Sequence, residues 1–484
     1  MNASKYQYNN SGQYFFCTMT IKLKLIIKSG MPKYLAICAA LEEAICRGQL
    51  HAGAQLPTHR QLAEQLNVSV QTVSNAYAHA EQKGLVEALV GSGTYVSKFQ
   101  IEKETEFMLL EDKETLGRAI DLSIAHPVCT ARHTQLFNEA LSKISLSHSG
   151  DLIRAARPVQ GQKQHISAVL NWLELQKLPA ESDRIILCNG ASHGLMLAMS
   201  TLLQPGDMVA CEALVDHGLI ARSRILNVKL CAIATDREGI IPEKFAAACK
   251  ANSIKVLCCT PSMSNPASCH MSLQRRSEIA AVAQKYKVMI IEDDVYGALE
   301  PNRIPPLSSF LPEQAFYITA LTKTVAPGMR TGFMQVPRHL IQHTTSLLAA
   351  SSWMATPMLF EIAAMWIKDG TLQRLISFEQ QEFAARQRLA QTSLSEFEYD
   401  SHPNGMHLWL SLPRDWSSDA LVATAKKADL IITGYQPFIV DQSLPLKRVR
   451  VSLGMESSRY RVKYGLELLA DILSSKPPPS YFLI

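Results

Sequence analysis

The stretch VMIIEDDVY, residues 288–296, decides the fold of the larger part of this chain. Its first four residues form a short apolar run that predicts a buried strand, and the carboxylates and tyrosine that follow predict the polar end of that strand. Similar runs lie at residues 184–187, 208–210 and 255–257, with helical patterns between them. This alternation is typical of an α/β fold with a doubly wound sheet, which binds ligands at the carboxyl ends of its strands.

Polar motifs follow several of these strands. NGAS, residues 189–192, comes after the first strand and begins a helix, so its backbone N–H groups are placed to bind a phosphate. TPSMSNP, residues 260–266, follows the third strand. TALTK, residues 319–323, is followed closely by PGMR, residues 327–330. Because strand ends meet at one edge of a sheet, we expect these motifs to form a single ligand site.

The amino-terminal part predicts a separate small domain. Apolar residues recur at helical spacing over residues 34–45. LPTHRQLA, residues 56–63, begins a second helix in which Thr58 and Gln61 fit a capping box. A third helix follows after a tight turn, and residues 85–96 predict a hairpin with a glycine turn. Three helices and a hairpin in this order predict a winged helix-turn-helix.

This region resembles the GntR-type winged helix-turn-helix over about residues 33–97. The resemblance implies that the third helix enters the major groove of operator DNA and that the wing approaches phosphates. The residues that it assigns to DNA binding are Arg60, Ser69, Gln71, Thr72, Asn75, Gly91 and Gly93. The alternative is a small helical cap on an enzyme. The region is only mildly basic, so we expect DNA binding to need a homodimer.

Residues 120–475 resemble the fold-type I aminotransferases, and especially the MocR-like transcription regulators, in which such a domain is fused to a GntR-type domain. The resemblance implies a large sheet domain, a small C-terminal α+β subdomain and bound pyridoxal phosphate. Lys323 would form the Schiff base with this cofactor and is the expected catalytic residue. Asp293 would pair with the pyridine nitrogen. Arg450 would bind a substrate carboxylate through its guanidinium fork.

The same resemblance supplies the other cofactor contacts. Asn265 and Tyr296 would hydrogen-bond the 3-oxygen of the ring, and His217 would stack on its face. Phosphate contacts would come from side chains and from the start of a helix. The expected cofactor-binding residues are Lys323, Asp293, Tyr296, Asn265, Ala191, Ser192, His217, Thr322 and Arg330.

The chain departs from the family pattern at four places. Asp216 stands where an aromatic residue usually stacks on the ring, and Ala156 stands where a tyrosine usually reaches the partner's phosphate. Ala320 replaces a serine that usually contacts the phosphate, and residues 265–268 are NPAS in place of NPTG. Transamination needs tightly held geometry, so we expect it to be slow or absent.

Length and composition predict several folded domains. The chain has 484 residues, of which 47% are hydrophobic and 19% charged, and neither value indicates disorder. We expect an extension at residues 1–30, the DNA-binding domain at 31–98, an acidic linker at 99–119 and the large domain at 120–475. We also expect either that Met19 is the natural start or that the first 18 residues are disordered.

Other classes of protein are not supported by the sequence. The 11 cysteines are scattered and form no cluster at zinc spacing, so we expect reduced thiols and no metal site. Residues 340–360 carry no formal charge but are rich in polar side chains, which predicts a buried helix rather than a membrane span. No signal peptide is evident, and we expect a cytoplasmic protein without membrane contact.

Three functions remain open at this stage. The first is a DNA-binding transcription regulator that senses an amine, an amino acid or pyridoxal phosphate itself. The second is a catalytically active aminotransferase with an accessory DNA-binding domain. The third is a DNA-binding protein whose large domain has lost the cofactor and serves only dimerisation. The winged module favours the first.

Overall fold

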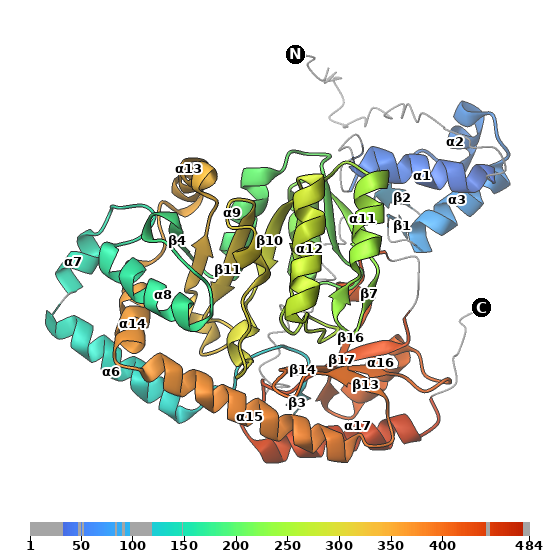
Figure 1. Ribbon diagram of the computed structural model, residues 1–484. Helices are drawn as coiled ribbons and strands as arrows, with labels where there is room; N and C mark the ends of the chain where they lie inside the picture. Colours follow the sequence, from blue (N-terminus) through green and yellow to red (C-terminus); the bar gives the residue numbers. More distant parts are fainter. Residues whose placement is uncertain are drawn as a thin grey trace, which may run out of the picture. The chain divides into compact units, whose positions relative to one another are not determined.

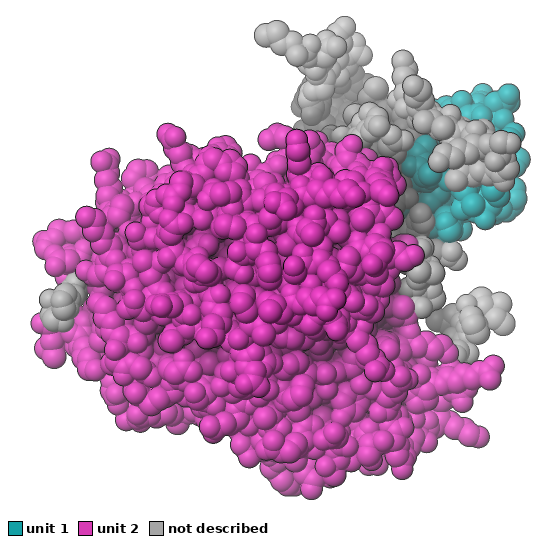
Figure 2. Space-filling model, viewed as in Figure 1, with its two compact units in different colours: residues 1–110 teal, residues 111–484 magenta. Residues whose placement is uncertain are grey.

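The computed structural model describes residues 32–46, 50, 53–82, 85–89, 92–96, 119–147, 149–441 and 446–477. The chain divides into two compact units, residues 1–110 and residues 111–484 (Figure 2). The expected extension at residues 1–30, and all of the expected linker except Ala119, lie outside the described residues.

The described residues of the smaller unit form three helices and a hairpin. These elements are α1 (Lys33–Cys46), α2 (His59–Leu66), α3 (Val70–Gln82), β1 (Val86–Leu89) and β2 (Gly93–Val96). The two strands pair antiparallel, with Val86 opposite Val96. Apolar side chains at helical spacing, among them Ile37, Leu62 and Val73, form the core. The predicted winged helix-turn-helix is confirmed.

Local hydrogen bonds define the starts of α2 and α3 in this unit. The Thr58 hydroxyl accepts from the Gln61 N–H, and the Gln61 side chain accepts from the Thr58 N–H, which completes the predicted capping box. The Ser69 hydroxyl accepts from a backbone N–H in the first turn of α3. The Tyr77 hydroxyl donates to the backbone oxygen of Pro57 at 2.8 Å. This last bond joins α3 to the segment that leads into α2.

The centre of the larger unit is a seven-stranded sheet (Figure 1). Its strands, in sheet order, are β4 (Ile185–Cys188), β12 (Gly332–Gln335), β11 (Ala315–Ala320), β10 (Met289–Asp293), β9 (Ile254–Cys259), β5 (Met208–Glu212) and β6 (Lys229–Ile233). All neighbours are parallel except that β12 runs antiparallel to β4 and β11. The four strands predicted from apolar runs are confirmed.

Helices cover both faces of this sheet. They are α6 (Ala131–Ser147), α7 (Ser149–Arg154), α8 (Lys163–Leu175), α9 (Ala191–Leu202), α10 (His217–Ile225), α11 (Pro242–Ala251), α12 (Leu273–Tyr286), α13 (Ile341–Ser352) and α14 (Pro357–Lys368). Successive strand residues pack on opposite sides: Ile186 lies in the core with α9, whereas Ile185 and Leu187 lie in the core with α8 and α14. Both faces are therefore buried, which explains why the strands are almost continuously apolar.

The C-terminal residues form a smaller α+β part of the same unit. Its four-stranded antiparallel sheet has the order β13 (Tyr399–Ser401), β14 (His407–Ser411), β17 (Arg448–Ser452) and β16 (Thr433–Gly434). The helices α15 (Thr371–Ser393), α16 (Ser418–Lys427) and α17 (Arg459–Ser474) pack with it. A separate parallel pair joins β3 (Ile120–Asp121) to β15 (Leu430–Ile431). Residues 120–121 thus belong to this C-terminal part.

The prediction of one buried helix over residues 340–360 is wrong. α13 ends at Ser352, Trp353 has a φ of 65°, and α14 begins at Pro357. Proline lacks the N–H that would continue a helix and favours a first-turn position, so the segment divides there. Only Thr344 and Leu348 of α13 are buried. Within the described residues, no helix is long and apolar enough to cross a membrane.

Candidate functional site

Lys323 lies three residues beyond the end of β11, and its ammonium group donates to the backbone oxygen of Ala125 at 2.7 Å. Burial lowers the pKa of Lys323, while the nearby carboxylate of Asp216 acts in the opposite direction. A lowered pKa increases the fraction of neutral amine, which is the nucleophilic form. The predicted lysine is thus a half-buried amine at the end of a central strand.

Asp293 is the last residue of β10, the strand next to β11. Its Oδ1 atom is buried and has no hydrogen-bond partner among the described residues. Burial, reinforced by the charge of Asp216, raises the pKa of Asp293 to about 7, although Arg222 opposes this shift. A buried carboxylate oxygen without a partner is costly, and a protonated ring nitrogen would satisfy it.

Arg450, Asn265 and Asp216 form a continuous chain of hydrogen bonds. Arg450 donates through Nη1 to Oδ1 of Asn265 at 3.0 Å, and Asn265 donates through Nδ2 to Oδ2 of Asp216 at 2.9 Å. The Arg450 guanidinium also lies 4.5 Å from the centre of the Phe438 ring. Tyr296 is buried beside Asn265. The structure therefore brings the predicted residues Arg450, Asn265 and Tyr296 to one place, although they come from three separate segments.

Asp216 was not predicted as a site residue, whereas the adjacent His217 was. The Oδ1 atom of Asp216 accepts from the Gly218 N–H and caps α10. Burial would raise its pKa, but His217, Lys323 and Arg222 together lower the pKa of Asp216 to about 2. Asp216 is thus an anion beside Lys323. The sequence did contain a signal for Asp216 as a site residue, because it occupies the position where an aromatic residue usually stacks on the cofactor ring.

His217 is the first residue of α10, and its side chain is 23% exposed. Its Nδ1 atom lies 3.6 Å from Oδ2 of Asp216. This places His217 next to the carboxylate that contacts Asn265.

A second group of predicted residues gathers at the start of α9. Gly190 is the N-cap with a φ of 83°, and no side chain caps the helix. Arg330 lies against this end, because a Cβ atom built on Gly190 would come within 2.8 Å of its Nη2 atom. Ser192 is exposed in the first turn, following the buried Ala191. The buried hydroxyl of Thr322 has no hydrogen-bond partner among the described residues.

These features fit the phosphate of pyridoxal phosphate. An uncapped helix start offers N–H groups to an anion, and the adjacent guanidinium and hydroxyl add charge-assisted contacts. Any side chain at Gly190 would collide with Arg330. The amine of Lys323, the unpartnered Oδ1 atom of Asp293 and this helix start have the chemistry that the Schiff base, the ring nitrogen and the phosphate of the cofactor require.

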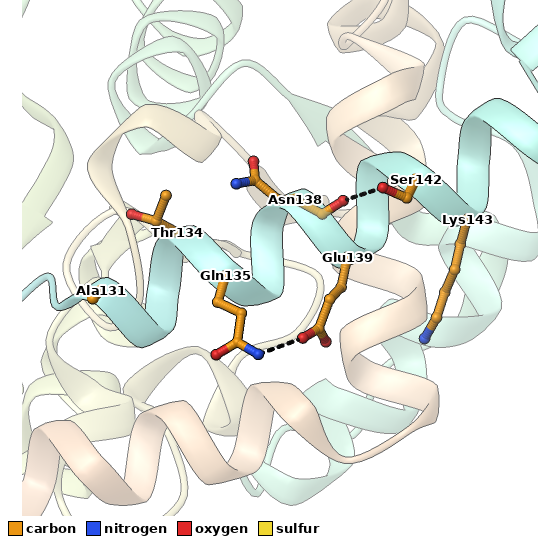
Figure 3. Close-up of a pocket in the computed structure, with 7 residues that line it drawn as sticks. All are labelled: Ala131, Thr134, Gln135, Asn138, Glu139, Ser142 and Lys143. Carbon is orange, nitrogen blue, oxygen red and sulfur yellow. Dashed lines mark hydrogen bonds between the residues drawn. The ribbon is translucent and has the colours of Figure 1, made fainter.

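A broad surface hollow elsewhere does not belong to this site. It lies over α6, has a volume of about 850 Å³ and is drawn in Figure 3. The residues that line it are Ala131, Thr134, Gln135, Asn138, Glu139, Ser142 and Lys143. Gln135 donates to Glu139 at 2.8 Å, within the helix. None of the predicted cofactor residues lines this hollow.

The predicted DNA-binding residues lie on α2, α3 and β2. Gln71 and Asn75 are exposed on α3, and the Gln71 amide donates to Oδ1 of Asn75 at 3.0 Å. Arg60 is exposed on α2, and Gly93 is the first residue of β2. Gly91 lies outside the described residues. These positions leave the Gln71 and Asn75 side chains available to a partner.

Thr72 corrects one expectation for this surface. The resemblance assigns Thr72 to DNA binding, which requires an exposed side chain, but Thr72 is half-buried and its hydroxyl lies 2.7 Å from that of Ser69. Ser69 also accepts from the Thr72 N–H at 3.1 Å. Both hydroxyls therefore take part in capping α3.

Comparison with known proteins identifies both parts. Residues 119–463 match the family model of aminotransferase class I and II. The chain belongs to the aminotransferase class I and II family. Residues 33–96 of this aminotransferase-family chain match the model of bacterial regulatory proteins of the gntR family. A gntR-family domain followed by an aminotransferase-family domain is the architecture of the MocR-like regulators.

Similar proteins share one or both parts. The HTH-type transcriptional regulator YdeF of Bacillus subtilis (strain 168) is 28% identical over 454 residues, which cover 93% of this chain and 96% of YdeF. The vitamin B6 salvage pathway transcriptional repressor PtsJ of Salmonella typhimurium is 25% identical, with 86% and 92% of the two chains covered. The crystal structure of an archaeal alanine:glyoxylate aminotransferase has a TM-score of 0.69 at 18% identity, covering 77% of this chain and 94% of that chain. The last similarity establishes the fold of the large unit as that of fold-type I.

Proposed function

We propose that this chain is a DNA-binding transcription regulator whose aminotransferase-like domain binds pyridoxal phosphate and responds to an amine, an amino acid or the cofactor itself. The observation that carries the cofactor part of the proposal is that two predicted cofactor contacts, Oδ1 of Asp293 and the hydroxyl of Thr322, are buried without a hydrogen-bond partner among the described residues. Asp293 ends β10, and Thr322 lies two residues beyond the end of β11. Unpartnered buried polar atoms destabilise a fold unless a ligand satisfies them.

The residues that would hold the cofactor divide into two groups. Asp293 would keep a proton on the ring nitrogen, and Asn265 and Tyr296 would hydrogen-bond the ring oxygen. Arg330, Thr322 and the start of α9 at Ala191 and Ser192 would bind the phosphate. The amine of Lys323 would hold the cofactor covalently. When bound, pyridoxal phosphate supplies a carbon that reacts reversibly with primary amines and a ring that withdraws electrons.

Arg450 would recognise the carboxylate of an amino-acid effector. Its guanidinium now donates to Oδ1 of Asn265 and to the backbone oxygen of Ser123. A planar carboxylate that binds this fork would compete with these acceptors. Because Asn265 is also bonded to Asp216, effector binding at Arg450 would rearrange the chain of hydrogen bonds next to Lys323.

The smaller unit would bind operator DNA. Gln71 and Asn75 present amide groups that suit base edges in the major groove, and Arg60 would contact phosphate. Ser69 at the start of α3 and Gly91 and Gly93 in the wing would approach the backbone, whereas Thr72 acts mainly through the cap of α3. The match to the gntR family supports this assignment.

A homodimer is part of the same proposal. Large apolar side chains are exposed on neighbouring helices of the larger unit: Leu146 is 88% exposed, Ile153 78% and Leu175 60%. A group of exposed apolar side chains is typical of an association surface. Sedimentation analysis of Ile153→Asp and of the unchanged chain tests this surface. If the variant is still a dimer, the dimer contact lies on another face.

The relatives and the substitutions favour sensing over rapid turnover. YdeF and PtsJ are both named as transcriptional regulators, and PtsJ is named as a repressor of vitamin B6 salvage, which supports the cofactor as one effector. Ala156, Ala320 and Asp216 replace groups that usually hold or stack on the cofactor. The second candidate, an active aminotransferase, is favoured by the retained Lys323 and Arg450.

One experiment separates the two candidates. Operator affinity and conversion of the cofactor to its amine form are measured on the same preparation, with a panel of amines and amino acids. We expect at least one ligand to change operator affinity, with slow or no turnover. Rapid multiple turnover of the cofactor, with no effect of any ligand on DNA binding, would overturn the proposal of a regulator and support an active aminotransferase.

A further inference from the structure

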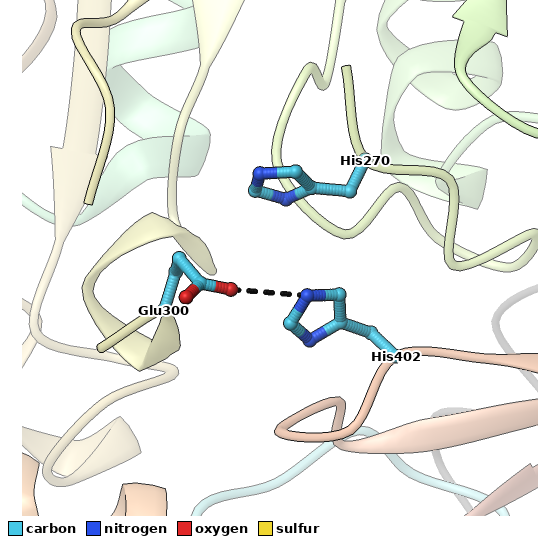
Figure 4. Close-up of side chains that lie close together, drawn as sticks. All are labelled: His270, Glu300 and His402. Carbon is cyan, nitrogen blue, oxygen red and sulfur yellow. Dashed lines mark ion pairs between the residues drawn. The ribbon is translucent and has the colours of Figure 1, made fainter. Parts of the chain in front are cut away.

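Three side chains that are not cofactor candidates converge from separate segments of the larger unit. His270 lies in the loop between the Asn265–Pro266 turn and α12, Glu300 follows the short 3-10 helix η2 (Gly297–Leu299), and His402 follows β13. Their nitrogen and oxygen ligand atoms all lie within 4.8 Å of one another. Figure 4 shows the two imidazole rings one above the other, with the Glu300 carboxylate directed toward His402.

The contacts within this cluster leave ligand atoms available. Oε2 of Glu300 lies 3.0 Å from Nε2 of His402, and the two side chains are 12% and 15% exposed. The His270 ring centre is 5.3 Å from that of His402. Nδ1 of His270 is buried and has no hydrogen-bond partner among the described residues. The contact between Glu300 and His402 accounts for two of the three side chains, whereas the buried Nδ1 atom of His270 has no partner among the described residues.

The chemistry of the three side chains suits a transition-metal ion. Two imidazoles and one carboxylate form a ligand set that binds Zn²⁺ and leaves a fourth position open.

Nearby positive charge is largely compensated. Arg303 forms a buried ion pair with Asp294, and Arg276 lies 4.0 Å from the carboxylate of Glu292. These carboxylates reduce the repulsion that the two guanidinium groups would otherwise exert on a cation at the cluster.

We propose that His270, Glu300 and His402 bind a divalent transition-metal cation, for which Zn²⁺ is the best match. Ligands about 2.0 to 2.2 Å from a tetrahedral ion lie about 3.3 to 3.6 Å apart. Nε2 of His402 and Oε2 of Glu300, now 3.0 Å apart, would separate slightly, and the nitrogen of His270, which lies within 4.8 Å of both, would adjust to the same spacing. Nδ1 of His402 now accepts from the Asn404 N–H at 3.2 Å. Coordination through Nε2 would put a proton on Nδ1, and the turn at residues 402–404 would have to change.

The three ligands come from two parts of the larger unit, so a bound metal ion would connect these parts. His402 belongs to the C-terminal α+β part, whereas His270 and Glu300 belong to the part built on the large sheet. His270 lies five residues after Asn265, and Glu300 lies four residues after Tyr296. A bound ion would therefore link the C-terminal part to the two loops that carry these candidate cofactor contacts. The site does not depend on the proposed function.

Calorimetric titration of the full chain with Zn²⁺, and with Mg²⁺ for comparison, tests the proposal. We expect one Zn²⁺ per chain at the cluster and no comparable binding of Mg²⁺, which prefers oxygen ligands. His270→Phe keeps a ring over His402, removes a nitrogen that has no partner, and should lower Zn²⁺ affinity by more than about tenfold. Glu300→Gln should lower it similarly. His339→Phe is the matched control, because His339 is 60% exposed and lies outside the cluster.

Anomalous diffraction at the zinc edge locates the ion independently of the variants. A peak between His270, Glu300 and His402 supports the site. Zinc affinity that is equal in His270→Phe, Glu300→Gln and the unchanged chain would overturn it, as would a peak at cysteine thiols instead. The thermal unfolding of each variant without metal shows whether the fold is retained, so a loss of binding through unfolding is recognised.

Discussion

Nδ2 of Asn265 donates a hydrogen bond of 2.9 Å to Oδ2 of Asp216, so an amide expected to contact the cofactor ring is held by a carboxylate where an aromatic side chain is usual. Asp216 also acts on Lys323 and Asp293, because its charge raises the pKa of both. Asp216 therefore influences the charge of both Lys323 and Asp293, although the sequence shows it only as a departure from the family pattern.

The first prediction concerns this carboxylate. Asp216→Asn removes the negative charge and retains an oxygen that can accept from Asn265. The pKa of Asp293, about 7 in the unchanged protein, should fall toward its ordinary value because Asp216 contributes to raising it. Carbon NMR of labelled aspartate in the protein without cofactor measures this shift. Glu278→Gln on the exposed side of α12 is the control, and equal Asp293 titration in both variants would contradict the prediction.

The second prediction concerns the lysine. Lys323→Ala should abolish covalent retention of pyridoxal phosphate, while thermal unfolding stays close to that of the unchanged chain, since the Lys323 ammonium makes one hydrogen bond to Ala125. Mass spectrometry after borohydride reduction measures retention. Lys250→Ala on α11 should retain the cofactor. A reduced adduct in Lys323→Ala at the level of the control would assign the covalent bond to another lysine.

The third prediction concerns effector recognition. Arg450→Lys removes the guanidinium fork and should weaken the response to an amino acid by about tenfold or more, since a hydrogen bond to a charged group contributes about 1.5 to 3 kcal/mol. The response to the corresponding amine, which is the same ligand without its carboxylate, should change little. Spectral titration of the cofactor-loaded protein with such a pair of ligands measures the difference. Equal weakening for both ligands would show that Arg450 does not read the carboxylate.

The fourth prediction concerns pH and stability. Burial raises the pKa of Glu379 to about 8 from an ordinary value near 4.5, and its Oε2 accepts from the Val128 N–H. The folded chain thus binds this proton more tightly than the unfolded chain does. Glu379 therefore favours folding at low pH, and this contribution is lost as the pH rises from about 4.5 to about 8.

Glu379→Gln mimics the protonated form of Glu379 and tests whether the contribution of this residue to stability falls as the pH rises. The variant should gain stability over the unchanged chain as the pH rises through that window, by a few kcal/mol at about 1.4 kcal/mol per pKa unit. Urea unfolding at several pH values measures the difference. The two proteins should be close in stability near pH 5, where Glu379 is protonated in the folded state. A difference that does not vary with pH would contradict the prediction.

The fifth prediction concerns DNA. Gln71→Ala should lower affinity for the operator by about 1 to 3 kcal/mol and leave nonspecific affinity almost unchanged, because an amide contact to a base edge distinguishes sequences. Arg60→Ala should lower both affinities and reduce the salt dependence. Fluorescence anisotropy with operator and scrambled duplexes at two salt concentrations measures both effects. Equal losses for the two duplexes in Gln71→Ala would remove Gln71 from base recognition.

Much of the architecture could be predicted because its signals are local. Apolar runs before polar motifs predicted β4, β5, β9 and β10, and the capping box at Thr58 predicted the start of α2. The predicted helix over residues 340–360 was wrong because the absence of charge indicates burial only on average. The sequence pattern shows neither the left-handed conformation of Trp353 nor the exposure of α13.

The sequence by itself determined the element types, their order and the chemistry carried to each strand end, including Lys323, Asp293 and Arg450. Only the tertiary structure decided which side chains meet. Asp216 reaches Asn265 because β5 and β9 are neighbours in the sheet, and His402 reaches Glu300 because the C-terminal part packs beside the loop that follows β10. Periodicity and capping depend on residues within a few positions of one another, whereas these contacts depend on strand order and packing between segments far apart in the chain.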